Sequence, residues 1–222
     1  MTDLFLVAGL GNPGDRYVGT RHNAGFEAVD TFVANAAASS GLSPVRVDRL
    51  DCRSLTGRVR LGDRTVLVAK PQTFMNLSGE SVKGLVTKYE IPLERLLVVV
   101  DDLALPVGRV RLKGSGSSGG QKGLQSVIDC LKTQAVPRLR VGVRGDHFRE
   151  GEDRADYVLD RFPKSERALY QEGLADAASA IETFVLSGLD AAMNRFNRSP
   201  EDPADTSETL GSGKARATAP AV

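Results

Sequence analysis

Short apolar runs along the chain predict the strands of a buried sheet. Leu4–Ala8, Thr65–Lys70 and Leu96–Val100 are too short for typical helices, and runs of this kind are typical of strands covered on both faces. The run at 96–100 has five apolar residues, three of them β-branched, and predicts the central strand. Segments 108–113 and 138–144 alternate basic and apolar residues, which predicts strands with one basic face.

Apolar positions three and four residues apart predict the helices. Phe26, Val29 and Phe32 place one apolar face on a helix over residues 23–38. Further helices are expected from Ser78, as the N-cap, to about Glu90, over 124–131, and from Lys164 to about Phe196 with a break at Ser187-Gly188. Residues 47–61 are expected to be extended and to form an antiparallel pair with the strand at 65–70 through a turn at Gly62-Asp63.

Length and composition limit the class of protein. A chain of 222 residues with 41% apolar and 26% charged residues is ordinary for a globular protein and long enough for one sizeable domain. The net charge of +1 gives no overall field that would attract nucleic acid, although a local basic patch still can. From Arg198 the composition shifts to Pro, Ser, Thr, Gly and Ala, so we expect a domain over 1–197 and a disordered tail over 198–222.

The sequence shows no sign of a membrane segment, a signal peptide or a metal site. No apolar run approaches the about 18 residues of a membrane helix, and Thr2 and Asp3 stand where a signal peptide carries basic residues. We expect a cytoplasmic protein, with a mature organellar form as the alternative. Cys52 and Cys130 lie far apart without a Cys or His at metal-ligand spacing, so neither a disulfide nor a metal is expected.

The glycine-rich loop Gly9–Gly14, directly after the first strand, marks the first candidate site. His22 follows it at the expected start of a helix. Catalytic groups of α/β proteins commonly lie at this end of the strands, and an imidazole can act as base and acid near neutral pH. The other histidine, His147, lies in the charged loop 145–156. We therefore select His22, with a helix-capping or solvated histidine as the alternative interpretation.

Two later segments also carry polar groups where strands end. Asp101 and Asp102 follow the central strand, where buried carboxylates are costly unless they have partners. Either they form a solvated pair that opens a loop, or one of them accepts a hydrogen bond from an imidazole and raises its basicity. The loop Gly114–Gly123 has five glycines and leads straight into a helix. Its N–H groups, with Arg111 and Lys122, favour phosphate, but it lacks the ending of a P-loop.

These sequence features support two hypotheses about function. Gly9–Gly14 fits the glycine spacing of a dinucleotide-binding loop, but a turn replaces the helix that should begin there, and Asp30 is a poor match for the ribose-binding acid. The alternative is hydrolysis of a substrate linked to RNA. If the sheet brings Asn12, His22, Asn76, Asp101 and the 114–123 loop together, they supply the base, the orienting acid and the amide donors for attack of water on a carbonyl.

Long motifs, in their order and spacing, closely resemble the bacterial-type peptidyl-tRNA hydrolase family. They are GLGNPG…Y…TRHNAGF, KPQTFMNLSGESV, VVVDDLALPVG and GSSGGQKGLQSVI, and the resemblance extends from about Leu4 to Phe196. It implies a monomeric single α/β domain, in which helices flank a twisted sheet of parallel and antiparallel strands. The implied activity is hydrolysis, without a metal or other cofactor, of the ester between a peptide and the terminal ribose of tRNA.

The resemblance also implies the roles of individual residues. His22 would be the base that activates water, and Asp101 rather than Asp102 the acid that orients it. Asn12 and Asn76 match the asparagines that hold the scissile end and the oxyanion. Substrate-cleft residues would be Tyr17, Phe74 and Met75, and basic contacts to tRNA phosphate would be Arg111, Lys113 and Arg140. Taken without the resemblance, Phe74-Met75 before a helix predicts a hydrophobic staple or core anchor.

The chain departs from the family pattern in two places. Gln121-Lys122 stand where the family usually has His-Asn. The side chain of Lys122 cannot accept a hydrogen bond, so it cannot replace the asparagine, but it can pair with a tRNA phosphate. Ala104 stands where many members have a second Asp. The alternative within the resemblance is a relative that binds RNA without hydrolysing it. The enzyme is favoured by the presence of all four of Asn12, His22, Asn76 and Asp101.

Overall fold

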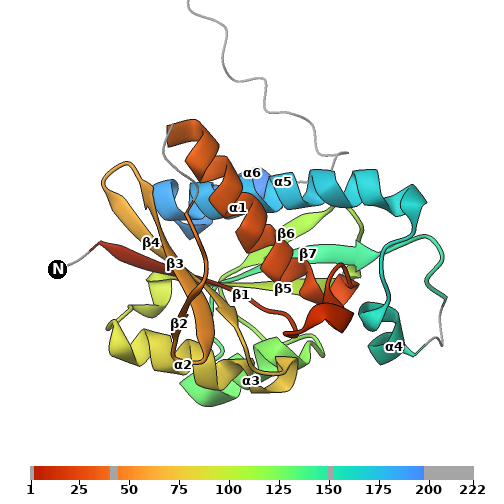
Figure 1. Ribbon diagram of the computed structural model, residues 1–222, viewed down its shortest axis with the longest axis horizontal. Helices are drawn as coiled ribbons and strands as arrows, with labels where there is room; N and C mark the ends of the chain where they lie inside the picture. Colours follow the sequence, from red (N-terminus) through yellow and green to blue (C-terminus); the bar gives the residue numbers. More distant parts are fainter. Residues whose placement is uncertain (1–2, 41–44, 150–152, 198–222) are drawn as a thin grey trace, which may run out of the picture.

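The computed structural model describes residues 3–40, 45–149 and 153–197, which form one α/β domain (Figure 1). The strands of its seven-stranded sheet lie in the order β2-β3-β4-β1-β5-β7-β6. The centre is parallel and consists of β4 (Arg64–Pro71), β1 (Leu4–Gly9), β5 (Leu96–Pro106) and β7 (Arg138–Arg144). Antiparallel strands form the edges: β2 (Arg49–Asp51), β3 (Ser54–Leu61) and β6 (Val110–Lys113). The predicted α/β domain with a mixed sheet is confirmed.

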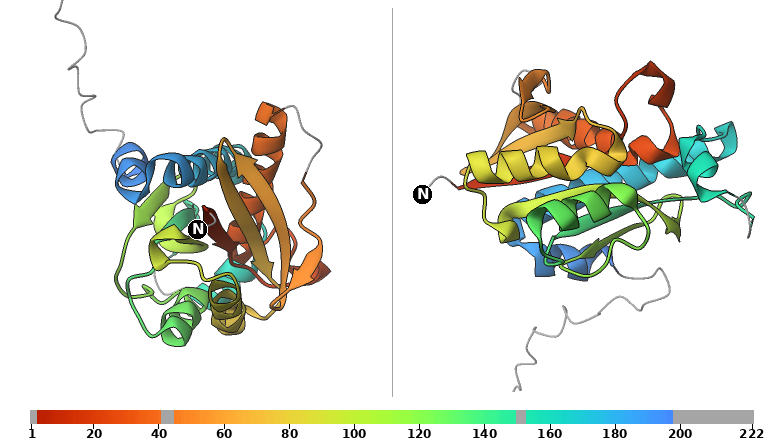
Figure 2. Two further views of the ribbon diagram at one scale, coloured as in Figure 1. Left: turned by 90° about the vertical axis from the view of Figure 1, so that its left-hand side faces the viewer. Right: turned by 90° about the horizontal axis from the view of Figure 1, so that it is seen from below.

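Helices cover both faces of the sheet (Figures 1 and 2). One layer contains α1 (Ala24–Ser40), α5 (Lys164–Ser187) and α6 (Leu189–Phe196), and the other contains α2 (Ser78–Lys88) and α3 (Lys122–Leu131). Along β1, Phe5 and Val7 face the first layer, whereas Leu6 and Ala8 face the second. Because both of its faces are covered, β1 is an unbroken apolar run. No described helix combines the length and apolar character needed to span a membrane.

The elements differ from the sequence-based expectations in a few places. β5 continues to Pro106, so Asp101 and Asp102 lie within the strand and pair with β7 instead of opening a loop. The N-cap prediction for Ser78 is wrong, because the 3-10 turn η3 (Met75–Leu77) runs directly into α2 and no side chain caps the helix. Part of the expected loop 145–156 begins the short helix α4 (Arg154–Leu159). The tail expected over 198–222 lies outside the described residues.

The order of connections creates a crevice at one end of the sheet. From β1 the chain passes through α1 and the β2–β3 hairpin to β4, and then crosses through α2 to β5. It continues into β6 at the edge of the sheet, and α3 leads from β6 back to β7. The first α-helix after β1 is α1 and the first after β5 is α3, and these two helices lie on opposite faces of the sheet. This reversal defines a topological switch point at the carboxyl ends of β1 and β5, where ligand sites of open α/β sheets occur.

Glycines in the first loop serve close packing of the backbone. A Cβ atom at Gly9 would lie 2.1 Å from the carbonyl oxygen of Gly25, and one at Gly11 would lie 2.8 Å from the side-chain oxygen of Asn23. The loop then forms two 3-10 turns, η1 (Asp15–Tyr17) and η2 (Arg21–Asn23), before α1 begins. A dinucleotide-binding loop requires the helix to start among the glycines, so this geometry does not support that alternative.

Candidate active site

His22 and Asp101 meet at the switch point. Nδ1 of His22, in η2, lies 2.9 Å from Oδ2 of Asp101, in β5. The side chain of His22 is 13% exposed and that of Asp101 is 4% exposed, so the imidazole reaches the surface while the carboxylate does not. An ionised carboxylate can only accept hydrogen bonds. Nδ1 therefore carries the shared proton, and Nε2 is the nitrogen left to act as a base.

The side chain of Asn12 is held in one orientation by the backbone. Its Oδ1 accepts the N–H of Met75 at 2.8 Å, which identifies the oxygen because a backbone N–H can only donate. The backbone N–H of Asn12 donates to Oδ1 of Asn23 at 2.7 Å, and Nδ2 of Asn23 donates to the Asn12 carbonyl at 3.1 Å. Among the described residues the Asn12 Nδ2 group has no hydrogen-bond partner, so it remains as a donor for a ligand oxygen.

Gln121 is a further residue of the site, although from the sequence it was only a departure from the family pattern. Its Nε2 donates to Oδ1 of Asp101 at 2.9 Å, and its Oε1 accepts the N–H of Leu124 at 2.7 Å as the N-cap of α3. Both oxygens of the Asp101 carboxylate therefore have partners, one in η2 and one at the start of α3. The sequence feature that could have indicated this role is the position of Gln121 between the glycines and the helix, where a capping side chain is expected.

A cleft of about 1410 Å³ extends from this cluster. Its walls include most of the residues selected from the sequence: Asn12, Tyr17, His22, Phe74, Met75, Asn76, Asp101, Lys113, Lys122 and Arg140. Of the selected residues only Arg111 is absent from the lining. Phe74 is 54% exposed, whereas its neighbour Met75 is buried in the core beside α3, so the core-anchor interpretation describes only the second of the two.

Basic side chains gather on one face of β6 and β7. Arg111 pairs in register with Arg140, and Lys113 pairs with Arg138, which places the four side chains on the same face. Arg140 forms an ion pair with Asp102, so this carboxylate is not simply solvated. Arg138 is buried and its Nη2 donates to the Gly116 carbonyl at 3.0 Å, and burial together with the charge of Arg140 lowers the pKa of Arg138.

Arg21 fixes the turn that carries His22, a role that the sequence did not reveal. Its guanidinium is buried, donates to the Val143 carbonyl at 2.9 Å and lies 2.7 Å from Oε2 of Glu166. The rings of Tyr157 and Phe162 lie on it, each with its centroid 4.4 Å away. One side chain thus ties η2 to β7, to α4 and to the start of α5. Because His22 is the next residue, this tie restricts the position of the imidazole.

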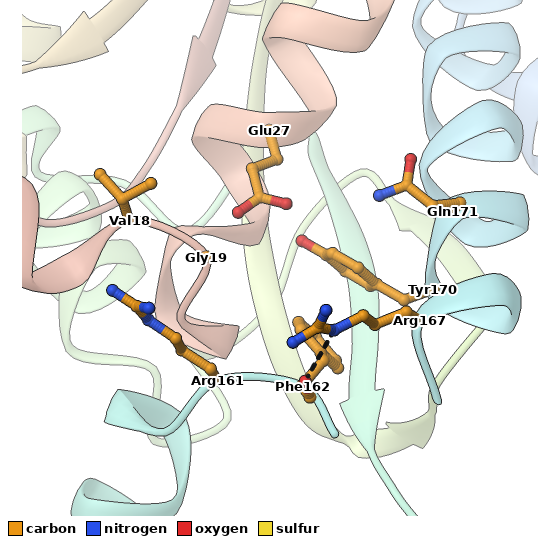
Figure 3. Close-up of a pocket in the computed structure, with 8 residues that line it drawn as sticks. All are labelled: Val18, Gly19, Glu27, Arg161, Phe162, Arg167, Tyr170 and Gln171. Carbon is orange, nitrogen blue, oxygen red and sulfur yellow. Dashed lines mark hydrogen bonds between the residues drawn. The ribbon is translucent and has the colours of Figure 1, made fainter. Parts of the chain in front are cut away.

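A smaller cavity of about 340 Å³ lies between the loop after η1, α1 and the start of α5 (Figure 3). Its lining residues are Val18, Gly19, Glu27, Arg161, Phe162, Arg167, Tyr170 and Gln171. Burial raises the pKa of Glu27, and burial beside that carboxyl raises the pKa of Tyr170. Both shifts favour the protonated forms. None of the residues selected from the sequence lines this cavity.

The fold and the site define a class: single-domain α/β proteins with an imidazole–carboxylate pair and an anchored asparagine at the switch point of the sheet. The family model for peptidyl-tRNA hydrolase matches residues 6–204. The peptidyl-tRNA hydrolase of Alkaliphilus metalliredigens is 42% identical over 194 residues, covering 87% of this chain and 100% of that protein. The chain belongs to the peptidyl-tRNA hydrolase family.

Further relatives agree in sequence and in structure. The peptidyl-tRNA hydrolase of Moorella thermoacetica is 45% identical over 199 residues, which cover 89% of this chain and 100% of that protein. The crystal structure of peptidyl-tRNA hydrolase from Acinetobacter baumannii matches with a TM-score of 0.75 at 32% identity, over 89% of this chain and 96% of that chain. The similarity therefore covers the whole α/β domain, including every segment that contributes to the cleft.

Proposed function

We propose that the protein hydrolyses the ester bond between a peptide and the terminal ribose of tRNA, and so recycles tRNA from peptidyl-tRNAs released by the ribosome. Membership of the family supports this substrate class. The observation that carries the proposal is the hydrogen bond of 2.9 Å between His22 and Asp101 in the wall of a large cleft. It is the arrangement that general-base attack of water on an ester requires.

The chemistry follows from the free nitrogen of His22. Nε2 takes a proton from a water molecule while the water oxygen bonds to the ester carbonyl carbon, and Asp101 stabilises the imidazolium that results. The tetrahedral intermediate then collapses, the bond from the carbonyl carbon to the ribose oxygen breaks, and the imidazolium returns the proton to that oxygen. The products are a free peptide acid and a tRNA with its ribose hydroxyl restored.

Asn12 and Asn76 are proposed to hold the reacting ester. The Nδ2 group of Asn12 is oriented by the Met75 N–H and is the donor for the carbonyl oxygen as it becomes negative. Asn76 is exposed on the cleft wall in the neighbouring turn η3 and can bind the scissile end from the other side. A preorganised donor of this kind is worth about 3 kcal/mol of transition-state stabilisation.

Separate parts of the cleft are proposed to bind the peptide and the tRNA. Tyr17, Phe74 and Met75 give an apolar surface for the peptide end. Lys113 and Lys122 are exposed on the lining and attract phosphate, and Arg111 extends the same basic face beyond it. Arg140 is proposed as a further phosphate contact, although its pairing with Asp102 means that a phosphate must share the guanidinium with that carboxylate.

We further propose that the protein acts as a cytoplasmic monomer, with the catalytic domain over 1–197 and a disordered tail over 198–222. The family resemblance and the composition after Arg198 support these proposals. Light scattering of the purified protein tests the oligomeric state, and a molecular mass of one chain is expected. Limited proteolysis tests the tail, because cleavage is expected after residue 197 while the domain survives.

The deciding experiment is single-turnover release of peptide from a purified peptidyl-tRNA without added metal. We expect cleavage by the wild type and a rate on the order of a thousandfold lower for His22→Ala, with tRNA binding retained. His147→Ala is the matched control, because this exposed histidine does not line the cleft. If the wild type binds tRNA and leaves the ester intact, the protein is a non-hydrolytic RNA-binding relative. An unchanged rate in His22→Ala excludes His22 as the base.

A further inference from the structure

We propose that Gln121 is a positioning residue for the His22–Asp101 pair, acting as an uncharged clamp on the second oxygen of the carboxylate. The inference rests on the proposed function, since it concerns the groups that carry the hydrolysis. It assigns to Gln121 a role beyond capping a helix. The carboxylate is held at one oxygen by the imidazole and at the other by the amide, at 2.9 Å in both cases.

The orientation of the Gln121 amide follows from its second partner. Oε1 accepts the backbone N–H of Leu124 at 2.7 Å. A backbone N–H can only donate, so the oxygen of the amide faces the helix and the NH2 group faces Asp101. The same side chain therefore caps α3 and clamps the carboxylate. A rotation of Gln121 that released Asp101 would also leave the first turn of the helix without its cap.

Close packing holds the start of α3 in place against the site. A Cβ atom at Gly123 would lie 2.4 Å from Sδ of Met75 and 2.9 Å from a methyl carbon of Leu10. The Nε2 group of Gln121 also lies 3.3 Å from Sδ of Met75, whose backbone N–H holds Asn12. Gln121 thus lies between the two halves of the site, with the oxyanion donor on one side and the base on the other.

The clamp has a defined electrostatic consequence. A hydrogen bond to Oδ1 stabilises the negative charge of Asp101 and reduces the charge that Oδ2 offers to the imidazole. It also prevents the carboxylate from rotating away from His22. An amide does not titrate, so the clamp has the same strength across the working pH range. Loss of the donor should concentrate charge on Oδ2 and favour the protonated imidazole.

Other charged groups surround the pair from several elements. The Asp102–Arg140 ion pair joins β5 to β7, Lys113 extends from β6, Lys122 begins α3, and Asp153 and Arg154 lie on the cleft wall at the start of α4. Gln121→Leu leaves the number of charges around the pair unchanged, so a change in the titration of His22 in that variant reports the clamp.

The test uses two replacements and a matched control in the full chain. Gln121→Glu keeps an oxygen to accept the Leu124 N–H but turns the donor toward Asp101 into a second carboxylate. Gln121→Leu removes the donor, and with it the cap of α3, without adding charge. Gln125→Glu is the control, because Gln125 lies one turn further on, and its Nε2 also donates to a carboxylate, that of Asp129, at 2.8 Å. All three proteins should show the same helix content as the wild type.

The primary readout is the NMR titration of the histidine signals, which needs no activity. The chain has only two histidines, and His147→Gln assigns them. We expect the pH midpoint of the His22 signal to rise by about one pH unit in Gln121→Glu and by a smaller step in Gln121→Leu. The midpoint in Gln125→Glu should stay at the wild-type value. A midpoint unchanged in Gln121→Leu would overturn the proposal, because the added charge alone explains a rise seen only in Gln121→Glu.

The pH profile of single-turnover hydrolysis supplies the second readout. Only the neutral imidazole can act as the base, so the acid side of the pH–rate profile should move upward with the NMR midpoint. The rate of Gln121→Glu should fall by about tenfold on that acid side and recover at high pH. A loss that is equal at every pH marks Gln121 as a helix cap only. If the wild type does not hydrolyse the ester, the proposed function fails, and the NMR titration still decides the clamp.

Discussion

Nδ1 of His22 lies 2.9 Å from Oδ2 of Asp101, although 79 residues separate them in the chain. The contact exists because β1 and β5 are parallel neighbours, with Gly9 in register with Val99, two residues before Asp101. The turn after β1 and the end of β5 therefore lie at the same edge of the sheet. This strand order brings the base and its orienting acid together at that edge.

Asp101→Asn should lower the single-turnover rate by on the order of tenfold to a hundredfold, less than His22→Ala. The wild-type carboxylate accepts from His22 Nδ1 and from Gln121 Nε2. An asparagine has one acceptor oxygen, so it can satisfy only one of these donors, and the imidazole is no longer held with Nε2 as the base. The rate of peptide release is the measurement, and a rate equal to that of the wild type would exclude the pairing from catalysis.

Lys122→Ala should weaken binding of tRNA and reduce the slope of log affinity against log salt concentration by about 0.7 to 0.9, the contribution of one phosphate contact. Lys122 is exposed on the cleft lining at the first residue of α3. Arg111→Ala, on the basic face of β6, should show the same change if tRNA extends past the cleft. Filter binding at several salt concentrations gives the slopes.

The control for these variants is Lys83→Ala, which removes one positive charge from the exposed side of α2, away from the cleft lining. Its salt slope should equal that of the wild type. If the slope of Lys122→Ala or of Arg111→Ala also stays unchanged, the residue concerned makes no phosphate contact. Any loss of affinity would then have another cause.

Local sequence patterns were sufficient for most of the helices and strands. The alternation of basic and apolar residues predicted β7 at 138–144 as it is observed, because side chains of a strand face opposite sides in turn. The break predicted at Ser187-Gly188 separates α5 from α6. The cap at Ser78 failed for a physical reason, since η3 already supplies the turn that an N-cap would start.

Contacts between distant segments were beyond the reach of local patterns. The residues alone selected His22 and a carboxylate at the end of the central strand, and the resemblance chose Asp101 over Asp102. Gln121 was noted only as a departure from the family pattern, because its role depends on α3 beginning beside β5. Arg140 was expected to contact tRNA phosphate, and its ion pair with Asp102 was not foreseen because it depends on the register of β5 and β7. Such pairs follow from strand order, which no single segment of sequence contains.

Arg21→Leu should lower the free energy of unfolding by about 3 kcal/mol, because it leaves the buried carboxylate of Glu166 without its partner. Urea denaturation gives the value. Arg46→Leu is the control, since the Arg46–Asp48 pair is largely exposed and should contribute less than about 1 kcal/mol. The double variant Arg21→Leu/Glu166→Leu should recover part of the loss. A small effect of Arg21→Leu would show that the tie between η2 and α5 is dispensable.

Asp51 joins the β2–β3 hairpin to α2. Lys88 Nζ donates to its Oδ1 at 2.6 Å, and the Tyr89 hydroxyl donates to its Oδ2. The carboxyl group is largely buried, with 6% of the side chain exposed. The hydrogen bonds from Lys88 and then from Tyr89 lower the pKa of Asp51 from 3.8 to about 2. The folded state therefore binds the proton of Asp51 more weakly than the unfolded chain does.

The lowered pKa of Asp51 predicts a window of pH dependence in the stability. The stabilising contribution is fully present above about pH 4, where the carboxyl is ionised in both states, and it is lost as the pH falls through the folded-state pKa of about 2. In urea unfolding at pH 6, Asp51→Asn should have a lower free energy of unfolding than the wild type. This difference in free energy should narrow steadily from pH 4 to pH 2. Asp63→Asn, in the exposed turn between β3 and β4, is the control and should show no such narrowing. If the difference in unfolding free energy between Asp51→Asn and the wild type stays constant down to pH 2, the hydrogen bonds to Asp51 do not stabilise its charge.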